Sequence, residues 1–363
     1  MLKSTSIKAI LILSLSLFSV AIFANEVHQE ETPEKDEKYN PVPAIMDHIM
    51  DSHGWHLWGG GHDAVSIPLP VILWTDNGLV TFMSSQFHHD VEGHHIVSKN
   101  GLNFVNFHEK IYQLENGVEH LEFNEEGSVA NIRPTDLSIT KNIASMLVSV
   151  MILFFVFFKA AASYKGDMKA PKGIAGFMEP IILFVKNDIA IPNIGEKKHM
   201  KFMPYLLTAF FFIWFNNLLG LVPFVPGGAN LTGNIAVTMV LAVFTLLLTN
   251  LNGNKHYWAH IVWMPGVPAV IKVLIITPLE IIGVFTKPFA LMIRLFANMT
   301  AGHIVVLSLI SLIFIAKTAF MGFVAVPFTL FISILELLVA LLQAYIFTML
   351  SALFIGAAVA DPH

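Results

Sequence analysis

The sequence predicts an all-α polytopic membrane protein that carries a small β-containing domain outside the membrane near its N-terminus. Hydrophobic residues make up 55% of the 363 residues and charged residues only 13%, about half the ~25% usual in soluble proteins. Long apolar segments follow Ile139, whereas 19 of the 26 acidic residues lie between positions 25 and 138. The net charge of −5 argues against nucleic-acid binding. The absence of cysteine excludes disulfide bonds and metal sites built from cysteine.

Residues 1–24 have the pattern of a secretory signal peptide. Lys3 and Lys8 precede an apolar run that ends in small residues before Ala24, and this order is typical of an exported chain. Ile22 occupies a position where a small residue is preferred, so an uncleaved anchor remains the alternative.

Residues 25–138 are expected to form an acidic, His-rich, β-rich domain. The alternating runs 67–74 and 79–83 flank Asp76-Asn77-Gly78, which is a strong hairpin signal. A second hairpin is expected around positions 115–117.

This region also holds 11 of the 16 histidines, and imidazole groups could bind zinc or copper. No pairing of them matches a closed metal site. A solvated acidic surface is therefore the preferred interpretation, and no metal or cofactor is expected.

From Ile139 onward, each apolar segment reaches the ~20 residues that a membrane-spanning helix needs. The predicted membrane segments are 139–162, 201–222, 231–252, 267–315 and 321–360, with an amphipathic surface helix at 172–188. A 40-residue helix would be ~60 Å long, about twice the hydrocarbon thickness. The last two segments must therefore tilt strongly, break, or both, and Pro278 and Pro288 are expected to bend the first of them.

The distribution of lysine predicts the orientation. Residues 159–201 carry eight lysines, and the positive-inside rule places such a loop in the cytoplasm. The N-terminal domain is then periplasmic and the C-terminus cytoplasmic.

Few polar residues interrupt the last two apolar segments, and ionisable groups at membrane depth are functional candidates by default. Glu280, Lys287 and Arg294 are seven residues apart and would share one helix face, with Asn298 one turn further on. His303 would point to the opposite side. In the last segment Glu336 and Gln343 share a face; the set is Glu280, Lys287, Arg294, Asn298, His303, Glu336 and Gln343.

The stretch Lys287-Pro-Phe-Ala-Leu-Met-Ile-Arg294-Leu-Phe-Ala-Asn298-Met-Thr-Ala-Gly302 resembles the signature of subunit a of the bacterial F-type (rotary) ATP synthases. The segment Asn216-Asn217-Leu-Leu-Gly220-Leu-Val-Pro223 and the run from Gln343 to Phe347 are similar to two other parts of that family. The resemblance covers about residues 140–358 and omits the His-rich domain, which looks like an extension.

The resemblance implies a proton-translocating stator subunit with two aqueous half-channels against a c-ring, separated by Arg294. It implies that Asn298, Gln343 and Asn217 are polar neighbours of Arg294, and that Glu280 lies on the cytoplasmic side of the proton route. His303 and Glu336 would be a proton-carrying pair exchanged between helices, and Gly220 stands where some members carry an acid. The implied partners are the c-subunit ring, the b-subunit peripheral stalk, other ATP synthase subunits and the lipid bilayer of the bacterial inner membrane.

Such a subunit would not itself catalyse ATP synthesis. The alternative is a secondary ion or metal transporter with a His-rich periplasmic domain. A transporter would usually show an internal repeat, and the two halves of this sequence show none.

Overall fold

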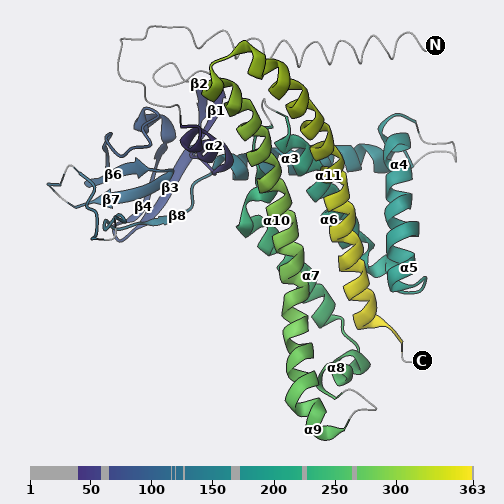
Figure 1. Ribbon diagram of the computed structural model, residues 1–363. Coiled ribbons are helices and arrows are strands. Elements are labelled where there is room, and N and C mark those ends of the chain that lie inside the picture. Colours follow the sequence, from purple (N-terminus) through teal and green to yellow (C-terminus); the bar gives the residue numbers. More distant parts are fainter. Residues whose placement is uncertain are drawn as a thin grey trace, which may run out of the picture. The chain divides into compact units, whose positions relative to one another are not determined.

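The structure is a computed structural model that describes residues 40–58, 65–115, 117–118, 120–125, 127–164, 172–222, 227–263 and 268–361 (Figure 1). The expected signal peptide, residues 1–24, lies outside the described residues. The fold class is confirmed: apolar helices dominate, and a small set of strands precedes them.

The N-terminal domain consists of a short helix and three small antiparallel sheets. Helix α2 (Val42–Ile49) precedes the strands, and strands β1 (Gly54–Trp58) and β2 (Val65–Pro68) pair with each other. The second sheet has the order β4-β3-β8 and the third β5-β6-β7. Their bounds are β3 Pro70–Thr75, β4 Gly78–Met83, β5 Val97–Lys99, β6 Leu102–Phe107, β7 Lys110–Leu114 and β8 Thr135–Asp136, with a 3-10 turn at Ser84–Phe87.

The first predicted hairpin is confirmed, and the second is wrong. Strands β3 and β4 pair from Pro70–Met83 to Thr75–Gly78 across the expected turn. The next hairpin joins β6 to β7 instead, and its turn is His108-Glu109, where both residues have positive φ (49° and 59°). Tight hairpin turns need this left-handed conformation, usually supplied by Asn-Gly, so the sequence signal favoured the wrong site.

The larger part of the chain is helical. Its elements are α3 Lys141–Ala162, α4 Ile174–Phe184, a π-helical turn Val185–Ala190, α5 Ile191–Ile194, α6 His199–Gly220, a 3-10 turn Leu231–Gly233, α7 Ile235–Leu251, α8 Lys255–Val262, α9 Ala269–Ile271, a π-helical turn Lys272–Ile276, α10 Thr277–Ala316 and α11 Ala319–Val359. Among the described residues four helical stretches are long and apolar enough to cross a membrane, or five if α7 and α8, bent by 102°, count as one span.

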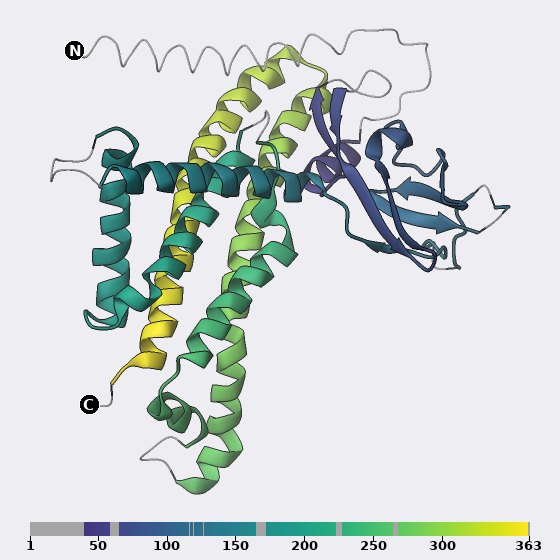
Figure 2. The same cartoon turned by 180° about the vertical axis from the view of Figure 1, so that it is seen from behind.

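Helices α10 and α11 remain continuous over 40 and 41 residues, and α10 passes through Pro288 without ending. In both views α3 runs across the picture whereas α10 and α11 run down it (Figures 1 and 2). If α3 crosses the bilayer along its normal, the two long helices α10 and α11 lie strongly inclined to that normal. Continuous inclined helices account for the excess length without a break.

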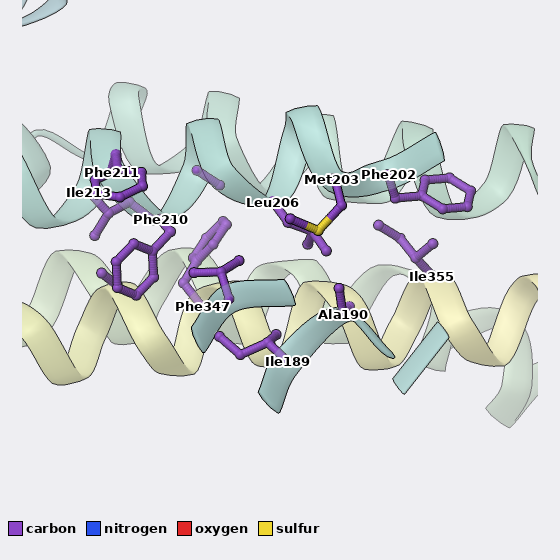
Figure 3. Close-up of a cluster of buried hydrophobic side chains, with 14 of the residues drawn as sticks. Ile189, Ala190, Phe202, Met203, Leu206, Phe210, Phe211, Ile213, Phe347 and Ile355 are labelled. Atoms are coloured by element: carbon purple, nitrogen blue, oxygen red, sulfur yellow. The ribbon is translucent and has the colours of Figure 1, made fainter. Parts of the chain in front are cut away.

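The helical core lies where α6 packs on α11. Figure 3 shows Phe202, Met203 and Leu206 of α6 facing Ile355 of α11 and Ala190. All five side chains are buried. This packing fixes the position of α11 and hence of the polar residues on it.

Candidate functional site

Arg294 lies on an open face of α10. Its neighbours Leu291 and Leu295 are almost fully buried, at 2% and 1% exposure, and they hold the adjacent face of the helix against the protein. Arg294 itself is exposed, as is Asn298 one turn further on. Within the described part of the chain, no carboxylate pairs with Arg294. A guanidinium on an apolar helix surface needs a polar or anionic partner, so this face fits a partner that brings a carboxylate.

His303 points away from this face, toward α6. A methyl group added to Gly220 would lie 3.6 Å from His303 Nε2 and 3.3 Å from the carbonyl oxygen of Ala229. The Nε2 atom is buried, and no described residue forms a hydrogen bond with it. Gly220 therefore leaves a narrow space beside a polar atom that has no protein partner.

Glu336 of α11 approaches the same turn of α10. Its carboxylate packs directly on Gly302, so a side chain at that position would collide with it. The Oε1 atom of Glu336 is also buried without a hydrogen-bond partner. No hydrogen bond or ion pair joins Glu336 to His303 among the described contacts, although Glu336 packs on the residue that precedes His303 in α10. Buried polar atoms normally have a partner, so each of these two atoms marks a place that fits a bound water molecule.

Asn217 has its amide satisfied by protein. Its side chain donates to the carbonyl oxygen of Ala340 (3.4 Å) and accepts from the hydroxyl of Thr232 (2.6 Å). It is fully buried and links α6 to α11. Gln343, 4% exposed, is buried on α11 one turn beyond Ala340.

Glu280 and Lys287 lie toward the N-terminal part of α10. Glu280 is half-buried and within electrostatic range of Tyr257 on α8. The Lys287 amine lies 5.9 Å from the centre of the Phe354 ring, and with Tyr257 and Asn250 it lines a small cavity. The structure thus places Glu280 and His303 on separate parts of α10, with Arg294 between them in the chain.

The N-terminal domain contains a buried charged group that the sequence analysis did not identify. His53 is 5% exposed; its Nε2 lies 2.8 Å from Asp136 Oδ2, and its backbone N–H donates to Glu109 Oε2 at 3.0 Å. Burial lowers the pKa of His53, but the hydrogen bonds and charges of Asp136 and Glu109 outweigh it and raise the pKa to about 9. For Asp136 the effect of burial has the opposite sign and raises the pKa, but the hydrogen bonds from His53 and Ser138 outweigh it and lower the pKa to about 2.

This group ties together β1, the β6–β7 turn and β8. Glu109 is one of the two turn residues with positive φ, so its bond to His53 helps to hold that unusual turn. Among the histidines that the structure describes, none joins two further ligating side chains in a metal-binding arrangement.

Comparisons with known proteins match these two regions separately. Residues 143–356 match the family described as the ATP synthase A chain. Residues 44–137 match a family described only as a domain of unknown function.

Relatives cover most of the chain. The chain is 45% identical to the ATP synthase subunit a of Chloroherpeton thalassium over 274 residues, covering 74% of this chain and 76% of that protein. It is 46% identical over 275 residues to the protein of the same name from Chlorobium phaeobacteroides strain BS1, covering 74% and 75%. It is 51% identical over 233 residues to ATP synthase subunit a 2 of Prosthecochloris aestuarii, covering 62% and 70%.

Proposed function

Because this chain belongs to the family of the ATP synthase A chain, the proton-translocating subunit of the Fo sector, we propose that Arg294 separates two proton half-channels against a ring of c-subunits. The single observation that carries the proposal is the exposed guanidinium on an apolar face of α10, with which no described residue forms an ion pair. The comparisons give no support to the alternative of a secondary transporter.

The physical role of Arg294 follows from its fixed charge. A c-subunit carboxylate must be neutral while it faces lipid, because an ion there is costly. Beside the guanidinium, the ionised carboxylate is favoured and its proton leaves. A guanidinium that stays protonated also repels protons that would leak directly between the half-channels.

The two sides of Arg294 have different polar groups. His303 and Glu336, with their unpartnered buried atoms, fit the periplasmic half-channel, and Gly220 leaves space beside them. Glu280, with Tyr257 near it, fits the cytoplasmic half-channel. Asn298 and Gln343 line the approach to Arg294, and Asn217 positions α11 relative to α6.

In this proposal the chain acts in the bacterial inner membrane, with its N-terminal domain in the periplasm and its C-terminus in the cytoplasm. A signal peptide at residues 1–24 directs export of the domain. The partners are the c-ring, the b-subunit peripheral stalk and the other synthase subunits. The chain is not itself an enzyme; ATP is made elsewhere in the complex.

The test replaces Arg294 in the assembled complex. Arg294→Ala is expected to abolish ATP-driven proton pumping and proton-driven ATP synthesis in membrane vesicles, whereas the subunits still co-purify. Arg294→Lys is expected to fail as well, because an ammonium lacks the planar fork of donors and can lose its proton when buried.

The matched control is Arg133→Ala, which removes the only other arginine of the chain, an exposed one in the N-terminal domain. It is expected to pump normally. Normal coupled pumping in Arg294→Ala would overturn the proposal.

A further inference from the structure

Helix α2 of the N-terminal domain lies against α10, the helix that carries Arg294 and His303. In Figures 1 and 2 α2 is beside α10 and close to the start of α3 in both views. The extension thus contacts the helix that carries the proposed route, although the family match to the membrane part begins only at residue 143.

The end of α2 is fixed to the first turn of α3 by four hydrogen bonds. Asp51 accepts from the hydroxyl of Thr140 (2.7 Å) and from the backbone N–H of Asn142 (3.0 Å). The carbonyl of Ser52 accepts from the backbone N–H of Lys141 (2.8 Å), and the carbonyl of His48 accepts from the Lys141 amine (3.5 Å). Asp51 therefore caps a helix that starts 90 positions later, and α2 cannot shift without uncapping α3.

This attachment brings His48 to the end of the proposed route. His48 and Lys141 both lie within electrostatic range of His303, whose buried Nε2 forms no hydrogen bond with any residue that the structure describes. The His48 side chain remains open to solvent, whereas Lys141 is buried at 8% exposure. On the way from the outside water to the membrane part, the exposed imidazole of His48 thus comes before the buried imidazole of His303.

We propose that α2 forms part of the periplasmic entrance of the proton route, and that His48 passes protons between the outside water and His303. This inference rests on the proposed function. One ring nitrogen of His48 would take a proton from water, and the other would release a proton inward, so the charge on the ring is restored after each transfer.

The charges around His48 suit this role. Partial burial and the charges of Lys141 on α3 and His56 on β1 lower the pKa of His48, and His303 on α10 is within electrostatic range of it. A lowered pKa leaves the ring largely neutral at neutral pH. It can then both accept and release a proton, rather than hold one.

The test uses the absence of cysteine in this chain. His48→Cys is introduced into the full chain, and the whole synthase complex is purified and reconstituted into liposomes. After assembly, the thiol is modified with a small trimethylammonium methanethiosulfonate reagent. The imidazole is already absent in His48→Cys, so proton-driven ATP synthesis is expected to fall before modification, and the attached cation is expected to lower it further. The modified complex should make ATP at least about tenfold more slowly than the unsubstituted complex, because a positioned proton-transfer group typically contributes roughly 10²–10⁴-fold.

A control variant and the timing of the modification separate a specific loss at position 48 from a general effect of the reagent or of misfolding. His94→Cys, at an exposed position of the same domain, is modified in the same way and is expected to keep full flux. The reagent acts after assembly, so the further loss that it causes at position 48 cannot come from misfolding. A fully modified His48→Cys complex with the flux of the unsubstituted complex would overturn the inference alone, whereas coupled flux in Arg294→Ala would overturn the proposed function.

Discussion

His303 of α10 and Glu336 of α11 each carry a buried polar atom with which no described residue forms a hydrogen bond. The sequence predicts that they approach each other or share a water molecule. The structure places Glu336 on Gly302, next to His303, without a direct hydrogen bond. A shared water molecule is therefore the part of this prediction that remains open to test.

We expect His303→Ala or Glu336→Gln to lower proton flux strongly, because each removes one of the two proton-carrying groups of the proposed periplasmic half-channel. The double variant His303→Glu with Glu336→His should recover part of the flux, since both groups are retained on exchanged helices. The measurement is ATP-driven proton uptake by membrane vesicles. Additive losses without any recovery would show that the two residues act separately.

His53 predicts a pH dependence for the N-terminal domain. Its pKa is raised from 6.5 to about 9, so its stabilisation is complete below pH 6.5 and is lost as the pH rises through 9. The pKa of Asp136 is lowered from 3.8 to about 2, so its stabilisation is complete above pH 3.8 and is lost as the pH falls through 2. The domain should be most stable between these limits.

Hydrogen exchange of β6 and β7 in the intact chain, corrected for the intrinsic effect of pH, should therefore speed up between pH 7 and 9. His53→Gln should destabilise the domain by about 3 kcal/mol and remove this dependence. His94→Gln, at an exposed position, should retain it. An unchanged pH dependence in His53→Gln would rule out His53 as its source.

At the scale of elements, α11 depends on a close approach to α5. A side chain at Gly356 would collide with the backbone carbonyl of Asn193, whereas nothing lies within 4 Å of the position that a side chain would take at Gly322. A carbonyl in a helix cannot turn aside, so the whole of α5 would have to move.

Gly356→Ala should therefore destabilise the chain by about 1–3 kcal/mol, observed as a lower melting temperature in detergent and a lower yield of complex. Gly322→Ala, in the same helix, should be neutral or stabilise by up to about 1 kcal/mol. Equal melting temperatures and yields for the two variants would contradict the close contact between Gly356 and Asn193.

The sequence predicted the helices better than the small sheets. The length of the apolar segments predicted helices too long to stand upright, but length alone cannot decide between a tilt and a break. The helix continues at Pro288, which the sequence marked as a bend. The turn at His108-Glu109 was missed because its conformation depends on the distant His53, which no local pattern reveals.

For the candidate site, the motif identified Arg294 and its polar neighbours. It could not reveal which contacts surround them. The approach of Glu336 to Gly302, the space at Gly220 and the contact of α2 with α10 arise from residues far apart in the chain. Only tertiary packing brings these groups together.

At the scale of the whole molecule, the membrane part is expected to assemble and translocate protons without the N-terminal extension, but at a lower rate. Deletion of residues 40–130 should leave an assembled complex that still translocates protons, because the matched route lies after residue 139. Flux should fall to about the level of the modified His48→Cys variant, because α2 is lost. ATP-driven proton uptake, with co-purification as the assembly control, measures both.

Two results would contradict this expectation. Undiminished flux would show that α2 has no part in the entrance. A complex that assembles normally but conducts no protons would make the extension an obligatory part of the path.

The cap that Asp51 places on α3 also has a consequence for biogenesis. Ribosomes make the chain from its N-terminus, so Asp51 is synthesised before the helix whose first turn it completes. Helix α3 then reaches its finished state only after the region around α2 has folded. Insertion of the membrane part and maturation of the extension become successive steps of one process, and a chain with a damaged extension would expose an unfinished helix end to cellular proteases.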